Sequence, residues 1–253
     1  MKKTVNSIQS MKHDGQKISM LTAYDYPTAR ILNDAEIDII LVGDSLGMVV
    51  LGFTDTRSVT MADMLHHTRI VARGNNNCLL VADFPYRTYE TREQAVENAH
   101  LLRQAGAHAV KPEGNKPEIV KAIVDNDIPV MGHVGLLPQT SEKFRVHGRK
   151  SCEAAQITDD AKALEAAGCF AIVLEGIPAH LAETITNALD IPTIGIGAGA
   201  ACDGQVLVIH DLIGLFERFS PIFVKQYANL GKELRRAVTL YRLEVRKGLF
   251  PDE

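Results

Sequence analysis

Short runs of consecutive apolar residues alternate along this chain with longer segments whose apolar residues recur at helical spacing. The clearest run is 39–42, Ile-Ile-Leu-Val, which is apolar at every position and ends at Gly43-Asp44-Ser45. Such a run predicts a strand that is buried on both faces, as in a parallel sheet. The strands predicted from runs of this kind cover residues 18–23, 39–42, 78–82, 109–111, 129–133, 170–174, 193–196 and 205–209.

Amphipathic segments separate these runs. In residues 60–73 the apolar side chains gather on one side of a helix, and Thr60 precedes them as a candidate N-cap. Thr91 takes the same position before the helix predicted for 92–105, and Gly106 stands just past its end. The other helices are predicted at 4–13, 27–35, 116–126, 152–167, 178–189 and 231–247.

Eight strand–helix alternations predict a parallel sheet, and right-handed crossovers over eight units close naturally into a barrel. The 253 residues suit a single (β/α)8 TIM barrel, and no linker or low-complexity tract divides them. We therefore expect one domain over 1–253 with a short N-terminal helix. A doubly wound open sheet is the alternative, but it needs a glycine-rich loop after the first strand, where Thr22-Ala23-Tyr24-Asp25 stands instead.

Composition narrows the class of protein. The net charge of −4 gives no bulk attraction to nucleic acid or to a membrane surface. The N-terminus has no apolar core typical of a signal peptide, and no apolar run approaches a membrane span. Four cysteines stand far apart without a CxxC pair, which favours free thiols in a reducing cytoplasm over disulfides or zinc.

Polar residues stand at the carboxyl ends of five consecutive predicted strands. These residues are Asp44 with Ser45, Asp83, Lys111 with Glu113, His133, and Glu175. In a (β/α)8 barrel such ends share one mouth, where chemistry is placed. A single polar residue at a strand end is explained by a capping role or by a buried polar group whose hydrogen bonds are satisfied. Five in succession favour a functional site, because buried charge is costly unless it is paired.

Three of these residues, Asp44, Asp83 and Glu113, are hard oxygen donors on neighbouring strands, which suits Mg²⁺. Zinc is disfavoured because only His133 adds a nitrogen ligand. The alternative for the trio is a salt-bridge network centred on Lys111. Lys111 and Ser45 are candidates to hold a substrate carboxylate. Glu175 stands apart on the sixth strand and is the better candidate for a general base.

Three further features carry weaker signals. His147 lies between Arg145 and Arg149 in a loop, which is more typical of a solvated surface than of a site. Gly195, Gly197 and Gly199 fit either a phosphate cradle or close packing against substrate. His210 with Asp211 is better explained by a structural role.

The ordered motifs resemble those of the ketopantoate hydroxymethyltransferase family over nearly the whole chain. The segments that carry this resemblance are 22–25 (TAYD), 41–47 (LVGDSLG), 82–85 (ADFP), 110–114 (VKPEG), 132–136 (GHVGL), 174–175 (LE), 194–199 (IGIGAG) and 203–205 (DGQ). The resemblance implies a barrel of the phosphoenolpyruvate mutase/isocitrate lyase superfamily and a role in pantothenate, hence coenzyme A, biosynthesis.

The resemblance also implies a chemistry. Mg²⁺ would be the cofactor, 5,10-methylenetetrahydrofolate the one-carbon donor, and 3-methyl-2-oxobutanoate the acceptor. It implies a high-order homo-oligomer such as a homodecamer. The residues that match the family's metal positions are Asp44, Asp83 and Glu113. Those that match its ketoacid-binding positions are Asp44, Ser45, Asp83 and Lys111, and His133 is added as a substrate contact. Glu175 matches the proton acceptor.

Two positions depart from the family pattern. The loop 140–149 looks shortened, since Phe144 runs directly into Arg145, and Pro112 stands where an aliphatic residue is usual. Two other functions remain as alternatives. A lyase or mutase of the same superfamily would place a catalytic Cys near the fourth strand, where 111–115 has none. A non-catalytic barrel module would be expected to lose part of the trio or Glu175.

Overall fold

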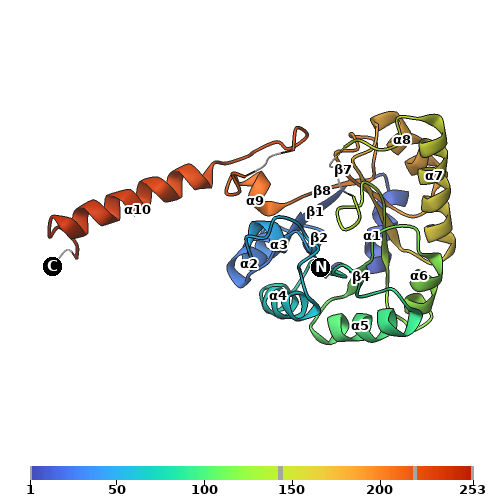
Figure 1. Ribbon diagram of the computed structural model, residues 1–253, viewed down its shortest axis with the longest axis horizontal. Coiled ribbons are helices and arrows are strands. Elements are labelled where there is room, and N and C mark those ends of the chain that lie inside the picture. Colours follow the sequence, from blue (N-terminus) through green and yellow to red (C-terminus); the bar gives the residue numbers. More distant parts are fainter. Residues whose placement is uncertain (1, 142–144, 219–220, 252–253) are drawn as a thin grey trace. The chain divides into compact units, whose positions relative to one another are not determined.

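The computed structural model describes residues 2–141, 145–218 and 221–251. Its parallel strands form a nearly closed barrel, so the predicted (β/α)8 fold is confirmed (Figure 1). The strands are β1 (Ile18–Thr22), β2 (Ile39–Val42), β3 (Leu79–Asp83), β4 (Ala109–Lys111), β5 (Met131–Gly135), β6 (Ala171–Glu175), β7 (Thr193–Ile196) and β8 (Gly204–Leu207).

The helices are α1 (Val5–His13), α2 (Tyr26–Asp34), α3 (Leu46–Val49), α4 (Met61–Gly74), α5 (Arg92–Gln104), α6 (Pro117–Val124), α7 (Ser151–Ala166), α8 (Ala179–Ala188), α9 (Ile209–Leu212) and α10 (Leu230–Arg246). The predicted N-caps are confirmed: Thr60 caps α4 and Thr91 caps α5, each accepting a hydrogen bond from a backbone N–H three residues on. None of the described helices is long and apolar enough to cross a membrane.

The strand order is β4-β3-β2-β1-β8-β7-β6-β5, and a parallel bridge between Val110 and Val130 brings its two ends together. Residues 1–206 and 207–253 form two compact units. The first unit holds the barrel, apart from the last residue of β8, and the second holds α9 and α10. The expectation of one domain over all 253 residues stays a prediction.

Three sequence predictions about element positions are corrected. Strand β5 covers Met131–Gly135, so His133 lies inside the strand and not at its end. The strand begins later than predicted because Pro129 has no N–H to donate to the ladder. It also ends later, because the chain beyond His133 continues to pair with β6 as far as Gly135, which lies opposite Glu175. Strand β8 ends at Leu207, and the residues predicted to complete it begin the short helix α9.

The third correction concerns the connection between β7 and β8, which contains no helix. Residues 197–203 make this crossover alone, and Gly197 and Gly199 both have positive φ, which ends regular structure. Strand β7 has only four residues, so a short connection is long enough to return to its start.

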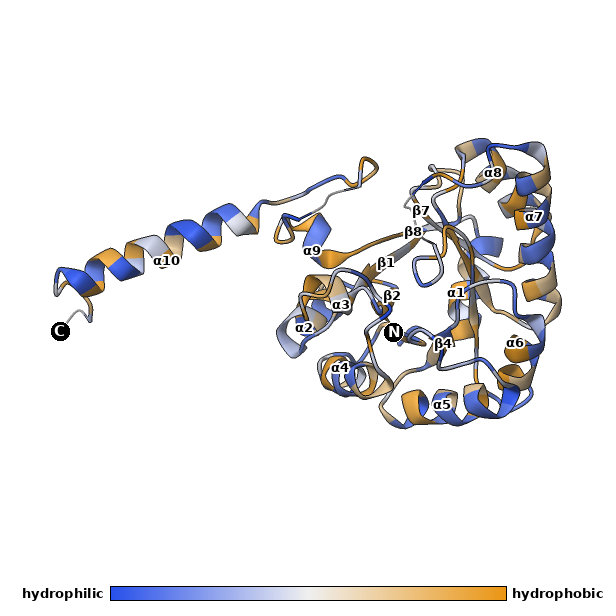
Figure 2. Ribbon diagram, in the orientation of Figure 1, coloured by the Kyte–Doolittle hydropathy of each residue, from blue (hydrophilic) through white to orange (hydrophobic). Residues whose placement is uncertain are grey.

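The barrel interior is apolar. Alternate residues of the strands, such as Met20, Leu41 and Val81, point inward and form one buried cluster with Ile8 and Met11 of α1. In Figure 2 the outer helices α5 and α7 carry both hydrophobic and hydrophilic residues, as expected for helices that cover a barrel and face water on the other side. Helix α1 is therefore part of the core and does not belong to the outer ring.

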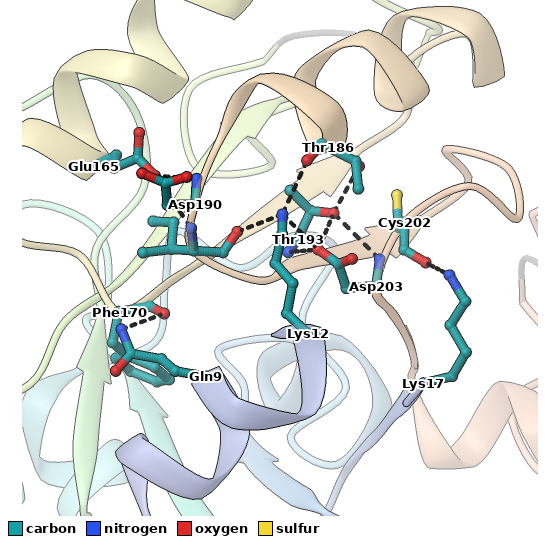
Figure 3. Close-up of polar contacts among 11 residues, drawn as sticks. Gln9, Lys12, Lys17, Glu165, Phe170, Thr186, Asp190, Thr193, Cys202 and Asp203 are labelled. Atoms are coloured by element: carbon teal, nitrogen blue, oxygen red, sulfur yellow. Dashed lines mark hydrogen bonds and ion pairs between the residues drawn. The ribbon is translucent and has the colours of Figure 1, made fainter. Parts of the chain in front are cut away.

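Polar contacts fix α1 against the amino ends of the strands (Figure 3). The Lys12 ammonium donates to the backbone oxygens of Thr186 at 2.9 Å and Ile191 at 3.0 Å, and it lies 3.1 Å from Asp203 Oδ2. Asp203 Oδ2 also accepts a hydrogen bond from the N–H of Thr193, the first residue of β7, at 2.9 Å. Helix α1 thus closes the amino end of the barrel and leaves the carboxyl end for a site.

Removing the Lys12 charge tests this closure. Lys12→Met keeps most of the apolar stem but leaves two carbonyls and Asp203 without their partner. We expect the free energy of unfolding in urea to fall by about 1–3 kcal/mol, as for hydrogen bonds to charged groups. Lys121→Met is the matched control, because Lys121 pairs with Asp125 on the exposed surface of α6 and should cost about 0.5 kcal/mol or less. Equal losses in the two variants would contradict the closing role of α1.

Candidate active site

Parallel register brings Asp83 and Lys111 side by side. They are the last residues of β3 and β4 and are direct partners in the ladder. Neighbours in register point to the same side of a sheet, and the Lys111 Nζ lies 2.9 Å from Asp83 Oδ1 with both side chains 5% exposed. The predicted salt bridge around Lys111 is therefore present at the carboxyl end of the barrel.

Asp44 joins this pair from the next strand. It follows β2, and its backbone N–H donates to Asp83 Oδ2 at 3.1 Å. Gly43 makes the approach possible: a Cβ there would lie 2.8 Å from Ser45 Oγ and 3.4 Å from Asp83 Oδ2. Ser45 Oγ lies 2.8 Å from the hydroxyl of Tyr24, a buried residue that follows β1. The turn after β2 therefore presents a carboxylate and a hydroxyl to the same mouth.

Glu113 reaches the group from the loop after β4. Its side chain is buried, and Oε1 lies 3.7 Å from His133 Nδ1. His133 Nδ1 also lies 3.5 Å from the Lys111 ammonium. An ammonium only donates, so this nitrogen acts as an acceptor and the neutral ring carries its proton on Nε2. We call this group the carboxylate cluster, and its members are Asp44, Asp83, Lys111, Glu113 and His133.

Glu175 lies at the edge of the cluster. It ends β6 opposite Gly135, and its Oε2 is 3.2 Å from His133 Nε2. Its side chain is 17% exposed, more than those of His133 and Glu113. The geometry therefore separates Glu175 from the three carboxylates on β2 to β4 and leaves it accessible at the barrel mouth.

The cluster has more negative than positive charge. Burial raises the pKa of Asp44 to about 7, and the neighbouring Asp83 carboxylate adds to the effect. Burial and then Asp44 raise the pKa of Glu113 well above its usual range. Burial alone would lower the pKa of Lys111, but Asp83, Glu113 and Asp44 outweigh it and raise that pKa. Burial and then Lys111 lower the pKa of His133, which keeps its ring neutral.

The remaining candidates behave differently. His147 Nδ1 lies 3.1 Å from Glu153 Oε1 on α7, and Arg145 pairs with the same carboxylate, so the loop cluster is tied to an outer helix. A Cβ at Gly195 would lie 2.9 Å from Cys202 Sγ, so this glycine packs closely against the protein itself, and the choice between a phosphate cradle and packing against substrate stays a prediction. His210 lies in α9, in the second unit. Part of the loop that looks shortened, at 142–144, lies outside the described residues.

Sequence reasoning missed three residues of the site. Tyr24 stands in a quoted motif but was given no role, and Tyr89 and Gln139 lie in loops after β3 and β5. Gln139 Nε2 donates to Asp44 Oδ2 at 2.8 Å, and Tyr89 donates to Gln139 Oε1 at 2.6 Å. Neither loop carries a charge pattern or spacing that would have indicated these contacts.

A family model described as ketopantoate hydroxymethyltransferase matches residues 2–253. The chain belongs to this family. A 3-methyl-2-oxobutanoate hydroxymethyltransferase of Syntrophus aciditrophicus (strain SB) is 54% identical over 257 residues, covering 99% of this chain and 94% of that protein. One of Moorella thermoacetica (strain ATCC 39073 / JCM 9320) is also 54% identical over 257 residues, covering 99% of this chain and 96% of that protein.

Solved structures share the fold of this ketopantoate hydroxymethyltransferase family member at low identity. A phosphonopyruvate hydrolase in complex with oxalate and Mg²⁺ has a TM-score of 0.64 at 14% identity, covering 97% of this chain and 88% of that one. A 2,3-dimethylmalate lyase of the phosphoenolpyruvate mutase/isocitrate lyase superfamily has a TM-score of 0.66 at 15% identity, covering 100% and 91%. At this identity the likeness supports the barrel fold alone.

The raised pKa of Asp44 predicts how stability depends on pH when divalent cations are removed with EDTA. Asp44 ionises near pH 3.9 when unfolded and near pH 7 when folded, so the folded state holds an extra proton between these values. Its contribution to stability is present below about pH 4 and is lost as the pH rises to about 7.

Asp44→Asn should therefore flatten the decline of melting temperature between about pH 4 and about pH 7. The asparagine oxygen still accepts from Gln139, so the packing is kept. Calorimetry at several pH values measures the slope. Asp125→Asn, on the exposed surface of α6, is the control that should follow the wild type. An identical slope in Asp44→Asn would show that Asp44 does not titrate in this range.

Proposed function

We propose that this chain transfers a hydroxymethyl group from 5,10-methylenetetrahydrofolate to 3-methyl-2-oxobutanoate, giving 2-dehydropantoate and tetrahydrofolate in pantothenate biosynthesis. Membership of the ketopantoate hydroxymethyltransferase family and the printed names of its relatives support the transferase activity. The observation that carries the proposal is the carboxylate cluster at the barrel mouth, with Glu175 held at its edge.

The cluster suits Mg²⁺ as a cofactor, held by Asp44, Asp83 and Glu113. No three His, Cys, Asp or Glu side chains within the described ranges already form a metal-binding group. The donor set nevertheless fits: these are hard oxygen ligands, and the pKa values of Asp44 and Glu113 are raised by burial and then by neighbouring carboxylates, an environment that favours a bound cation. When bound, the ion would supply Lewis-acid polarisation of the substrate's keto oxygen.

Substrate binding follows from the same charges. Lys111 supplies a buried cation toward the carboxylate of a 2-oxo acid, and Ser45 supplies a hydroxyl whose position Tyr24 fixes. His133 presents a neutral ring, which adds hydrogen bonding to the 2-oxo acid without adding charge. Lys111, Ser45 and His133 come from the part of the barrel between β2 and β5. A substrate that they hold by its carboxylate would turn its reacting carbon C3 toward β6.

Glu175 is the proposed base. The C3–H bond of the oxo acid breaks, and its proton goes to the Glu175 carboxylate. Its electron pair forms a bond to the methylene carbon as one of the two C–N bonds that hold this carbon in the folate breaks, and the freed nitrogen takes up the proton from Glu175. One water then supplies the hydroxyl oxygen as the second C–N bond breaks, and a proton of that water passes to the second nitrogen, which releases tetrahydrofolate. His133 Nε2 lies 3.2 Å from Glu175 Oε2, which places the imidazole ring directly beside the carboxylate. Partial exposure at the mouth leaves the Glu175 carboxylate within reach of the second substrate.

The alternatives find less support. A superfamily lyase or mutase needs a cysteine beside the fourth strand, and the four free cysteines at 78, 152, 169 and 202 lie elsewhere in the chain. A binding module without activity would have no need for a buried cluster of like charges that costs stability. The cytoplasmic location stays a prediction.

Deuterium exchange tests the base separately from one-carbon transfer. With Mg²⁺ and 3-methyl-2-oxobutanoate in deuterated water, the wild type should exchange the C3 hydrogen without folate, and a coupled assay with the folate should show turnover that EDTA abolishes. Glu175→Gln keeps the size of the side chain but cannot accept a proton. Its exchange should fall by about 10²–10⁴-fold, the usual effect of losing a general base.

Binding measurements make this result specific. Glu175→Gln should bind Mg²⁺ and oxo acid nearly as tightly as the wild type, since Glu175 lies outside the proposed metal ligands. Glu97→Gln is the matched control, since Glu97 lies exposed on the outer helix α5. Undiminished exchange in Glu175→Gln would assign the base elsewhere, with His133 next. Lost exchange together with lost Mg²⁺ binding would make Glu175 a ligand.

We also propose that the chain acts as a homo-oligomer such as a homodecamer. Helix α10 carries Leu234, Val238, Tyr241 and Val245 at helical spacing, and each of these residues is exposed. In Figure 2 hydrophobic and hydrophilic stretches alternate along α10. Stripes of this kind are typical of helices that pack against a partner surface. Multi-angle light scattering at micromolar concentration should show an assembly well above 27.7 kDa. A mass of one chain would exclude it.

A further inference from the structure

Gln139 makes contacts that join two of the proposed metal ligands from different strands. Its side chain is 1% exposed. Nε2 donates to Asp44 Oδ2 at 2.8 Å and to the backbone oxygen of Phe84 at 2.7 Å. Its backbone N–H donates to Glu113 Oε2 at 3.1 Å. One residue from the loop after β5 therefore contacts carboxylates that follow β2 and β4.

The orientation of the Gln139 amide is determined by its neighbours. The oxygen of Phe84 can only accept, so the amide atom beside it is the nitrogen. The amide oxygen then faces Tyr89, whose hydroxyl donates to it at 2.6 Å. The Tyr89 oxygen in turn accepts from the N–H of Glu113 at 3.3 Å, which leaves its hydrogen for Gln139. Each donor and acceptor in this chain of contacts has a consistent role.

The backbone around Gln139 is fixed as well. Thr140 and Ser141 both donate their N–H groups to the oxygen of Leu137, at 3.1 and 2.9 Å, which forms a tight turn around Gln139. At the other side, Leu136 donates to the oxygen of Glu175 at 2.8 Å, tying the segment to the end of β6. The amide is therefore presented to Asp44 by a rigid support.

We propose that Gln139 is a positioning residue that sets the spacing and direction of the Asp44 and Glu113 carboxylates, and thereby favours Mg²⁺ over larger divalent cations. Mg²⁺ requires nearly ideal octahedral geometry with short ligand distances, whereas Ca²⁺ accepts longer and more irregular coordination. Hydrogen bonds from outside the ligand set orient the ligands and typically contribute 10–100-fold to metal affinity. This inference rests on the proposed function, because it takes these carboxylates as the metal ligands.

Titration calorimetry with MgCl₂ and with CaCl₂, on the full chain after EDTA dialysis, tests this role without relying on activity. Gln139→Met keeps the length of the side chain and removes its side-chain hydrogen bonds, including the one to Asp44, while its backbone N–H can still donate to Glu113. We expect its Mg²⁺ affinity to fall by about 10–100-fold and its Ca²⁺ affinity to fall much less. Gln156→Met is the matched control, since Gln156 lies exposed on α7 and bonds only to Asp160.

A second variant keeps the test decisive where Gln139→Met folds poorly. Tyr89→Phe removes the hydrogen bond to Gln139 Oε1 and the one accepted from the Glu113 N–H, but leaves Gln139 Nε2 in place beside Asp44, so Mg²⁺ affinity should fall in the same direction by a smaller factor. Unchanged Mg²⁺ affinity in a folded Gln139→Met, or in Tyr89→Phe, would overturn the inference. Equal loss of Mg²⁺ and Ca²⁺ binding would also overturn it, because a merely structural role weakens both alike. A wild type that binds no Mg²⁺ would overturn the proposed function itself.

Discussion

The ion pair between Asp83 and Lys111 is the interaction on which the rest of the site depends. Two charges are removed from water at the ends of adjacent strands, and each is tolerable only because the other lies 2.9 Å away. The single positive charge of Lys111 neutralises the Asp83 carboxylate and leaves none for a second carboxylate. Asp44 and Glu113, buried beside it, are left with raised pKa values. The same burial that makes this cluster costly makes it receptive to a further cation, and an active site needs that property.

The barrel supplies the geometry for this arrangement by register. Parallel pairing aligns Asp83 with Lys111 and Gly135 with Glu175. The glycine opposite Glu175 adds no side chain of its own, and Gly43 leaves room for Asp83 beside Ser45. Backbone positions without side chains are thus as important for the mouth as the charged residues, because they let carboxylates from separate strands approach one another.

The sequence predicted the strands and the charged residues well, since apolar runs that end in a carboxylate or a lysine are visible without a structure. His133 was placed at a strand end and lies two residues before it, because pairing with β6 continues where side-chain hydropathy gives no signal. Gln139 was missed for a different reason. It contacts Asp44 across 95 residues of chain and Phe84 across 55, and a neutral amide in a loop has no pattern that indicates such partners.

Closure of the barrel by α1 has a consequence for synthesis on the ribosome. The helix leaves the ribosome well before the barrel is complete, because the carbonyls that Lys12 binds follow 174 and 179 residues later. At about 5–20 residues per second this is a wait on the order of ten to forty seconds. During that time Ile8 and Met11 have no completed core to enter. Helix α1 is therefore made long before it can reach its place, and the nascent protein has to keep the apolar side of this helix soluble until then.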